Sequence, residues 1–171
     1  NSVFFLDDVS IPHSWHTIEK NINDKLYIVV SPVGVDVDSS GVACRIVTLD
    51  AGNYNGLELA AELQLKTRAS ITNAFFPNLT VFSYNARRNN ITISPNYSGW
   101  QFKILTPNDI YSKLNGAWLG PSYDIDNPQD LNEVIGNVEG SSGFYNDTIV
   151  FNGEALNLQP IRNIYIHGSV G

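Results

Sequence analysis

The sequence predicts an all-β sandwich of about eight strands, with one amphipathic helix and short helical insertions. Three observations support this fold class. Short runs rich in β-branched and aliphatic residues recur along the chain, and Gly, Pro, Asn and Asp separate them. Only one segment, about residues 56–67, has apolar residues at helical spacing over several turns. No internal repeat and no long linker divides the 171 residues, so we expect a single domain over residues 1–171.

The expected strands are short and spread along the whole chain. In chain order the extended segments are Ser2–Leu6, Val9–Ile11, Ser14–Ile18 (an extended piece), Leu26–Val30, Val42–Leu49, Leu79–Tyr84, Ile91–Ser94, Trp100–Ile104, Thr148–Phe151 and Ile161–His167. The sixth and seventh of these form a hairpin across Asn85–Asn90. In Trp100–Ile104 apolar and polar residues alternate, which predicts one buried face and one solvent-exposed face.

The helix has the clearest local signals. Asn55 is placed as its N-cap, and Glu58 follows three residues later, as in a capping box. Glu62 and Lys66 have the favourable spacing for an ion pair on a polar stripe. Apolar residues cover most of the remaining circumference, so we expect the helix to be largely covered. Three of its residues are therefore expected to be buried: Leu57, Ala61 and Leu65.

Turn residues mark the ends of several elements. Gly52 lies between a strand and the helix, and we expect it at positive φ or in a tight turn. A short helix is predicted over Asn108–Leu114. Another begins at Asn127, with Pro128 at its first position, and ends near Ile135–Gly136.

Charge and composition restrict the function. The net charge of -7 argues against binding to nucleic acid or to anionic membranes. No apolar run approaches the roughly 18 residues of a membrane span, and no signal peptide is visible, so we expect no membrane insertion. The single cysteine, Cys44, excludes an internal disulfide framework. The chain contains no methionine, so we expect it to be part of a longer protein.

Chemistry-bearing residues give only weak signals. Asp36, Asp38 and Ser40 resemble the first half of a calcium-binding EF-hand loop, which has oxygen ligands at alternate positions. Val47 stands where that loop requires a bidentate glutamate, so these three residues are weak metal candidates and a generic loop is the simpler interpretation. No histidine or carboxylate group forms a catalytic constellation. We therefore expect no enzymatic activity and no cofactor.

Two regions are candidates for contact with a partner. Arg87 and Arg88 lie at the tip of the predicted hairpin and suit contact with a partner or a glycan, although a solvated turn is the simpler alternative. The irregular stretch Trp118–Phe144 and the loop Ser31–Gly41 are long for connections in a compact sandwich. Either they contribute to an interface or they fold back over the sandwich and cover the helix. The interface candidates are apolar and aromatic: Trp118, Leu119, Tyr123, Phe144 and Tyr145.

Several segments, taken in order, carry a resemblance to a known family. They are Val9–Ile18, Leu49–Leu57 with the helix that follows, Phe102–Thr106, Trp118–Gly120, Asn127–Asn132 and Arg162–Gly168. Over nearly its whole length the chain resembles the minor capsid or penton-like proteins of virophages, polinton-like viruses and related eukaryotic double-stranded DNA viruses. Members of that family usually extend beyond both ends of this sequence, which fits a part of a longer protein.

The resemblance implies a jelly-roll-like β-sandwich and a non-enzymatic structural role in the virion. The role would be that of a minor capsid, penton (vertex) or spike-base component acting through subunit–subunit contacts. Its partners would be other capsid subunits, and we expect a homo-oligomer. Assembly would take place inside the infected host cell.

Two other classes of function stay open. A carbohydrate-binding or host-receptor attachment module can use the same kind of sandwich. An exposed pair of coplanar aromatic rings would favour that function. A glycoside-active enzyme ranks last, and two carboxylates facing each other across a cleft would favour it.

Overall fold

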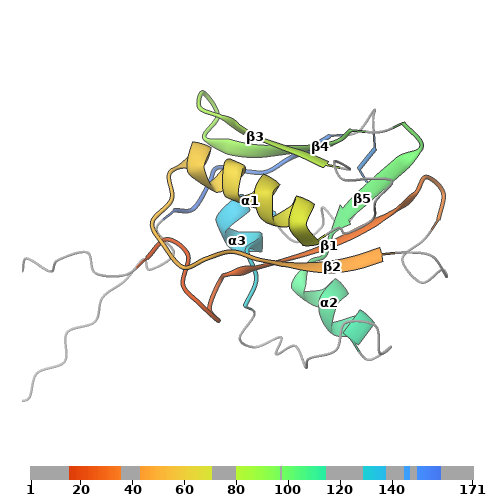
Figure 1. The fold of residues 1–171 in the computed structure, drawn as a ribbon, viewed down its shortest axis with the longest axis horizontal. Helices are drawn as coiled ribbons and strands as arrows, with labels where there is room; N and C mark the ends of the chain where they lie inside the picture. Colours follow the sequence, from red (N-terminus) through yellow and green to blue (C-terminus); the bar gives the residue numbers. More distant parts are fainter. Residues whose placement is uncertain are drawn as a thin grey trace, which may run out of the picture.

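The computed structural model describes residues 16–35, 43–70, 80–96, 98–114, 129–137, 145–146 and 150–158. Within these ranges the chain is mostly β, with six strands in two three-stranded antiparallel sheets and three helices (Figure 1). The predicted β-rich class is therefore confirmed. The strands predicted at residues 2–6, 9–11 and 161–167 lie outside the described residues.

The first sheet has the strand order β2-β1-β5. β1 (Lys25–Pro32) pairs antiparallel with β2 (Ala43–Thr48) on one side and with β5 (Trp100–Ile104) on the other. Every residue of β1 between its two ends is buried. The run of aliphatic residues in β1 explains this, since a central strand covered on both faces is apolar along its whole length.

Both faces of β5 are covered, so the predicted solvent-exposed face is wrong. Gln101 and Lys103 were expected to point into solvent, but they are only 7% and 9% exposed. Gln101 donates a hydrogen bond from Nε2 to Oγ of Ser31 at 3.2 Å. Lys103 Nζ lies 3.2 Å from Oδ1 of Asp109. The alternation in sequence misleads here because each polar side chain is paired by a residue from another element.

The second sheet has the order β3-β4-β6. β3 (Thr80–Asn85) and β4 (Asn90–Pro95) form the predicted hairpin, and β6 (Phe151–Asn152) pairs with the other edge of β4. In the turn, Oδ1 of Asn85 accepts hydrogen bonds from the backbone N–H groups two and three residues later, at 3.1 and 3.2 Å. This local bonding is the usual turn chemistry of asparagine.

α1 (Gly56–Ser70) lies between the β3–β4 hairpin and the first sheet (Figure 1). Its predicted capping box is confirmed. Oδ1 of Asn55 accepts hydrogen bonds from the N–H groups of Leu57 and Glu58, both at 3.0 Å. In return, the N–H of Asn55 donates to Oε2 of Glu58 at 2.9 Å.

Two short helices complete the described elements. α2 (Pro107–Leu114) matches the helix predicted over Asn108–Leu114. α3 (Asn132–Ile135) ends at Gly136, as predicted, with a left-handed φ of 67°. A Cβ at position 136 would lie 2.6 Å from the backbone N of Glu154, so only glycine fits there. The predicted start of this helix at residues 127–128 lies outside the described residues.

Gly52 was expected at positive φ or in a tight turn, but its φ is not positive and it lies in a bridge, so that prediction is wrong. It forms an isolated antiparallel bridge with Ile18. The N–H of each residue donates to the C=O of the other at 3.0 Å. The residue therefore serves in strand-like pairing, which ties the segment before β1 to the segment before α1.

One core connects the two sheets and α1. The largest fully buried side chains are Phe102, Phe151, Ile18, Leu26, Ile28, Leu59, Leu63, Ile91, Ile93, Ile104, Leu105 and Ile110. Tyr145 joins the sheets, because its ring stacks on Phe102 of β5 and meets Phe151 of β6 edge-on. The ring centroids are 5.2 Å and 5.4 Å apart, respectively. Such pairs stabilise beyond the area they bury.

Candidate interaction surface

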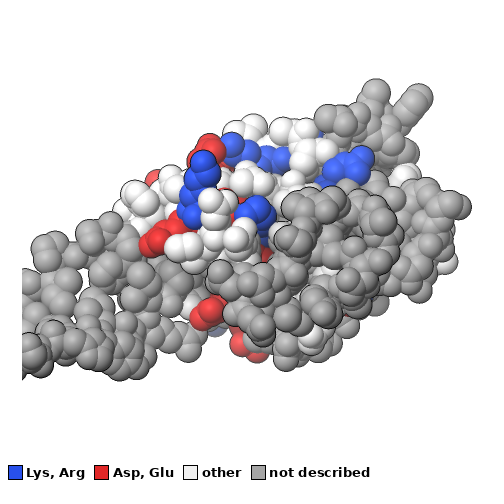
Figure 2. All heavy atoms as spheres, turned by 90° about the horizontal axis from the view of Figure 1, so that it is seen from below, with Lys and Arg blue, Asp and Glu red and all other residues white. Residues whose placement is uncertain are grey.

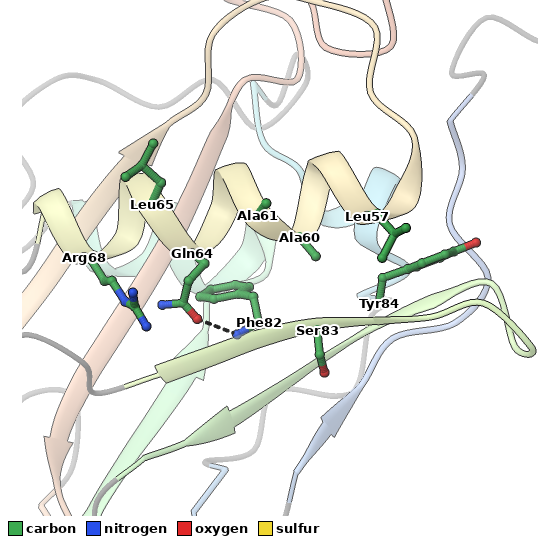
Figure 3. Close-up of a pocket in the computed structure, with 9 residues that line it drawn as sticks. All are labelled: Leu57, Ala60, Ala61, Gln64, Leu65, Arg68, Phe82, Ser83 and Tyr84. Carbon is green, nitrogen blue, oxygen red and sulfur yellow. Dashed lines mark hydrogen bonds between the residues drawn. The ribbon is translucent and has the colours of Figure 1, made fainter.

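An open groove of about 560 Å³ runs between α1 and β3 (Figure 3). Side chains of both elements line it: Leu57, Ala60, Ala61, Gln64, Leu65, Arg68, Phe82, Ser83 and Tyr84. Most of these side chains are apolar, and none carries a carboxylate. We call this feature the α1/β3 groove.

The groove exists because α1 has apolar residues on two sides. Leu59 and Leu63 face the core and are 0% exposed. Leu57 and Leu65 are 68% and 62% exposed, and Ala61 between them is exposed as well. The i, i+4 spacing of these three residues makes them one stripe along the groove. The prediction that they are buried is wrong, because the sheets cover only one side of the helix.

Gln64 fastens the helix to the edge of β3. Its Nε2 donates to the C=O of Thr80 at 3.0 Å, and its Oε1 accepts from the N–H of Phe82 at 2.9 Å (Figure 3). A side-chain amide has the same donor and acceptor as a peptide group. Gln64 therefore takes the place of a neighbouring strand over this part of the edge.

Along β3 from Phe82 towards the hairpin turn, the next residue whose backbone groups face this edge is Tyr84. Residues of an antiparallel strand alternate between its two edges, and Thr80 and Phe82 face the helix. The C=O of Ile91, which lies opposite Tyr84, accepts a hydrogen bond from the N–H of Gly153 on the far edge of β4, at 3.0 Å. The N–H and C=O of Tyr84 thus point away from β4. Within the described residues neither group has a hydrogen-bond partner.

The ring of Tyr84 closes this end of the groove. It packs so tightly on Gly56 that a Cβ at position 56 would overlap the ring. Its hydroxyl donates to Oδ1 of Asn89 in the hairpin turn at 2.9 Å. The absence of a side chain at Gly56 therefore sets how closely the first turn of α1 approaches β3.

The groove is basic at both ends. Arg68 lines the end towards the C-terminus of α1, and Arg87 and Arg88 lie in the turn after β3 at the other end. All three are exposed, and no carboxylate of the described residues pairs with them. On the face seen from below, several Lys and Arg side chains lie close together, with one acidic side chain among them, and other Asp and Glu side chains lie lower in the view (Figure 2).

The charged groups on the neighbouring side of α1 are paired. Lys66 Nζ lies 2.8 Å from Oδ2 of Asp50 and 3.6 Å from Oε1 of Glu62. These contacts, first of all the hydrogen bond to Asp50, raise the pKa of Lys66. Burial and the nearby charges of Glu62 and Asp50 raise the pKa of the Tyr54 phenol, which donates to the C=O of Asp50 at 2.8 Å. Among the described residues, the cations beside the groove therefore lack carboxylate partners, whereas the cation on this side has two.

Most residues that the sequence singled out for metal or partner contacts lie outside the described residues: Asp36, Asp38, Ser40, Trp118, Leu119, Tyr123 and Phe144. Tyr145 is described and half-buried, with its ring against the core. Arg87 and Arg88 lie at the hairpin tip, as the sequence predicts, and next to the groove. The partner contacts of these three residues stay predictions.

Sequence reasoning missed the groove itself. The residues that shape it, Gln64 and Tyr84, are ordinary helix and strand residues in the sequence. The one signal was an excess of apolar positions around the helix, more than a helix covered on one side requires. From the sequence we attribute that excess to a covered helix, whereas the structure shows that part of it is an exposed apolar face.

Among the described residues no group of three or more His, Cys, Asp or Glu side chains could hold a metal ion. In the same part of the chain, no helix has both the length and the apolar character needed to cross a membrane. No protein-family model matches the chain, and no curated protein and no solved structure is similar to it. Function must therefore be inferred from the residues of the chain itself.

Proposed function

We propose that this protein is a non-enzymatic structural component of a virion, which acts through contacts with other capsid subunits. Its place would be that of a minor capsid, penton (vertex) or spike-base subunit. The jelly-roll arrangement of about eight strands belongs to this proposal. The family resemblance in the sequence motivates it, and so does the β-rich fold with two small antiparallel sheets.

One observation supports the proposal most: the α1/β3 groove. Leu57 and Leu65 expose more than half of their surface beside an edge strand whose Tyr84 backbone groups are unpaired among the described residues. An apolar stripe and an open strand edge are the features that a repeating assembly uses for its contacts. They have no evident use in a protein that acts alone.

A carbohydrate-binding or receptor-attachment module is the competing class. It would need exposed, coplanar aromatic rings. The ring pairs of the described residues, Phe102–Tyr145 and Tyr145–Phe151, lie against the core. Phe82 in the groove is only 7% exposed. No observation therefore favours sugar binding over subunit contacts.

Purified particles provide the test. The gene would be expressed in its own virus, and particles would be banded on a density gradient and examined by quantitative mass spectrometry. We expect the protein in the particle band at a fixed ratio to the major capsid protein. A protein that is missing from the particles and monomeric by light scattering at high concentration would instead be a lone binding module.

A further inference from the structure

We propose that the α1/β3 groove binds an extended, acidic peptide segment of another protein, which pairs with the backbone of β3 at Tyr84. This inference deepens the proposed function, on which it rests for the identity of the partner as a neighbouring capsid protein. The binding mode itself is argued from the groove alone.

The backbone of β3 specifies an extended segment. Tyr84 offers one N–H and one C=O on the open edge, which is the pattern that a single residue of an incoming antiparallel strand completes. Addition of a strand to a sheet edge is a common way to recognise peptides. Gln64 already occupies the C=O of Thr80 and the N–H of Phe82, so the added pairing lies towards the hairpin end.

The apolar stripe specifies the middle of the segment. From Leu57 to Leu65 the helix rises about 12 Å, at about 1.5 Å per residue. An extended chain covers that distance with about four residues, and every second side chain points to the same face. Counting the first and last positions, three apolar side chains on one face of the segment would therefore contact Leu57, Ala61 and Leu65 in turn.

The charges specify the ends of the segment and argue against a second copy docked through the same groove. Arg68 stands at one end of the groove, and Arg87 and Arg88 at the other, with no carboxylate in the lining. Carboxylates flanking the apolar residues of the segment would complement all three cations. A second copy that docked with the same face would instead bring these cations against their own equivalents.

Fluorescence anisotropy with synthetic peptides tests the proposal on the full chain. The probe is a labelled peptide of sequence DEVTVTVDE, and the matched control is KKVTVTVKK, which has the same apolar residues and the opposite charge. We expect saturable binding of the acidic peptide only, and affinity that falls as sodium chloride is raised. A third peptide, DEVTPTVDE, should bind much more weakly, because proline removes a backbone donor and disturbs the strand.

Variants of the protein locate the binding. Combined Leu57→Asp and Leu65→Asp should abolish binding, whereas Val33→Asp, at an exposed valine away from the groove, should not change it. Combined Arg68→Glu, Arg87→Glu and Arg88→Glu should weaken binding about tenfold. Lys20→Glu is the charge control, at an exposed lysine outside the groove. All sites are exposed, and circular dichroism melts confirm that each variant folds.

Several results would overturn the inference: no binding of the acidic peptide, equal binding of the basic or the proline peptide, or full binding by the leucine variant. These results are distinct from failure of the proposed function. A protein that is present in particles but does not bind the peptide would keep its structural role and lose this mode of contact. If the protein binds the peptide but is absent from particles, the proposed binding mode stands and the proposed role in the virion fails.

Discussion

The two sheets of this protein differ in how completely they are covered. In the first sheet, the middle residues of β1 are all buried, and even the polar residues Gln101 and Lys103 of β5 are paired inside. In the second sheet, β3 alternates between buried and exposed residues, and a single glutamine covers part of its edge. The first sheet therefore has an enclosed central strand, while the second leaves part of an edge strand and an apolar groove exposed.

The helix α1 also has a covered side and an exposed side. We expect the largest change in stability from substitutions that compare these two sides. Leu63 is 0% exposed, whereas Leu65, two residues later, is 62% exposed. Leu63→Ala should lower the free energy of unfolding by about 2–5 kcal/mol, since it leaves a cavity in the core. Leu65→Ala should change it by less than about 0.5 kcal/mol. Urea denaturation of both variants measures the difference, and equal losses would mean that the groove is covered in solution.

Gly56 tests how tightly the open sheet is held to the helix. Gly56→Ala should cost about 1–3 kcal/mol, because the added methyl group meets the ring of Tyr84 and overpacks the contact. In a Tyr84→Ala background the same change should cost much less, since the ring is gone. A double-mutant cycle by thermal melting measures this coupling. If the effects of the two substitutions were simply additive, the contact with Tyr84 would not be the cause of the loss in Gly56→Ala.

The Gln64→Leu and Gln101→Leu variants compare the partly covered edge of β3 with the buried interior of the first sheet. Gln64→Leu leaves two backbone groups of β3 without their partner at a half-exposed site, and we expect a loss of about 1 kcal/mol. Gln101→Leu removes the buried bonds to Ser31 and to the C=O of Val35, and its cost should be larger, up to about 3 kcal/mol. Chemical denaturation ranks the two. The reverse order would contradict the distinction between the sheets.

The smallest expected effect is a loss of stability at alkaline pH. The pKa of Lys66 is raised above its ordinary value of 10.5, mainly by the hydrogen bond to Asp50, and that of Tyr54 is raised above 10.0, mainly by burial. Groups with a raised pKa in the folded state stabilise it fully below their unfolded pKa and lose this contribution as the pH rises through the folded pKa. Stability should therefore be constant near neutrality and fall above about pH 10.

The variant with Tyr54→Phe and Lys66→Met isolates this effect. Because it lacks both titrating groups, its melting temperature should fall less than that of the natural protein when the pH is raised through that range. If the melting temperatures of the two proteins fell in parallel with pH, other groups would be responsible for the loss of stability at alkaline pH.

Features that depend on neighbouring residues were predictable from the sequence, and features set by distant segments were not. Asn55 and Glu58 fix the start of α1 through bonds to each other, and Asn85 fixes the hairpin turn in the same way. The exposure of Leu57 and Leu65 depends on where β2 and β3 lie against the helix, which no local pattern contains. The burial of Lys103 likewise depends on Asp109 in α2, which follows β5 along the chain.

The central claim is that the protein joins its neighbours in a particle through the α1/β3 groove, and photo-crosslinking in assembled particles tests it most directly. A benzophenone amino acid would replace Leu65 in one virus and Val33 in another, and the particles would be irradiated. We predict that position 65 crosslinks to an acidic, extended segment of a second capsid protein, and that position 33 does not. Particles that lack the protein, or in which position 65 gives no crosslink to another protein, would contradict the claim.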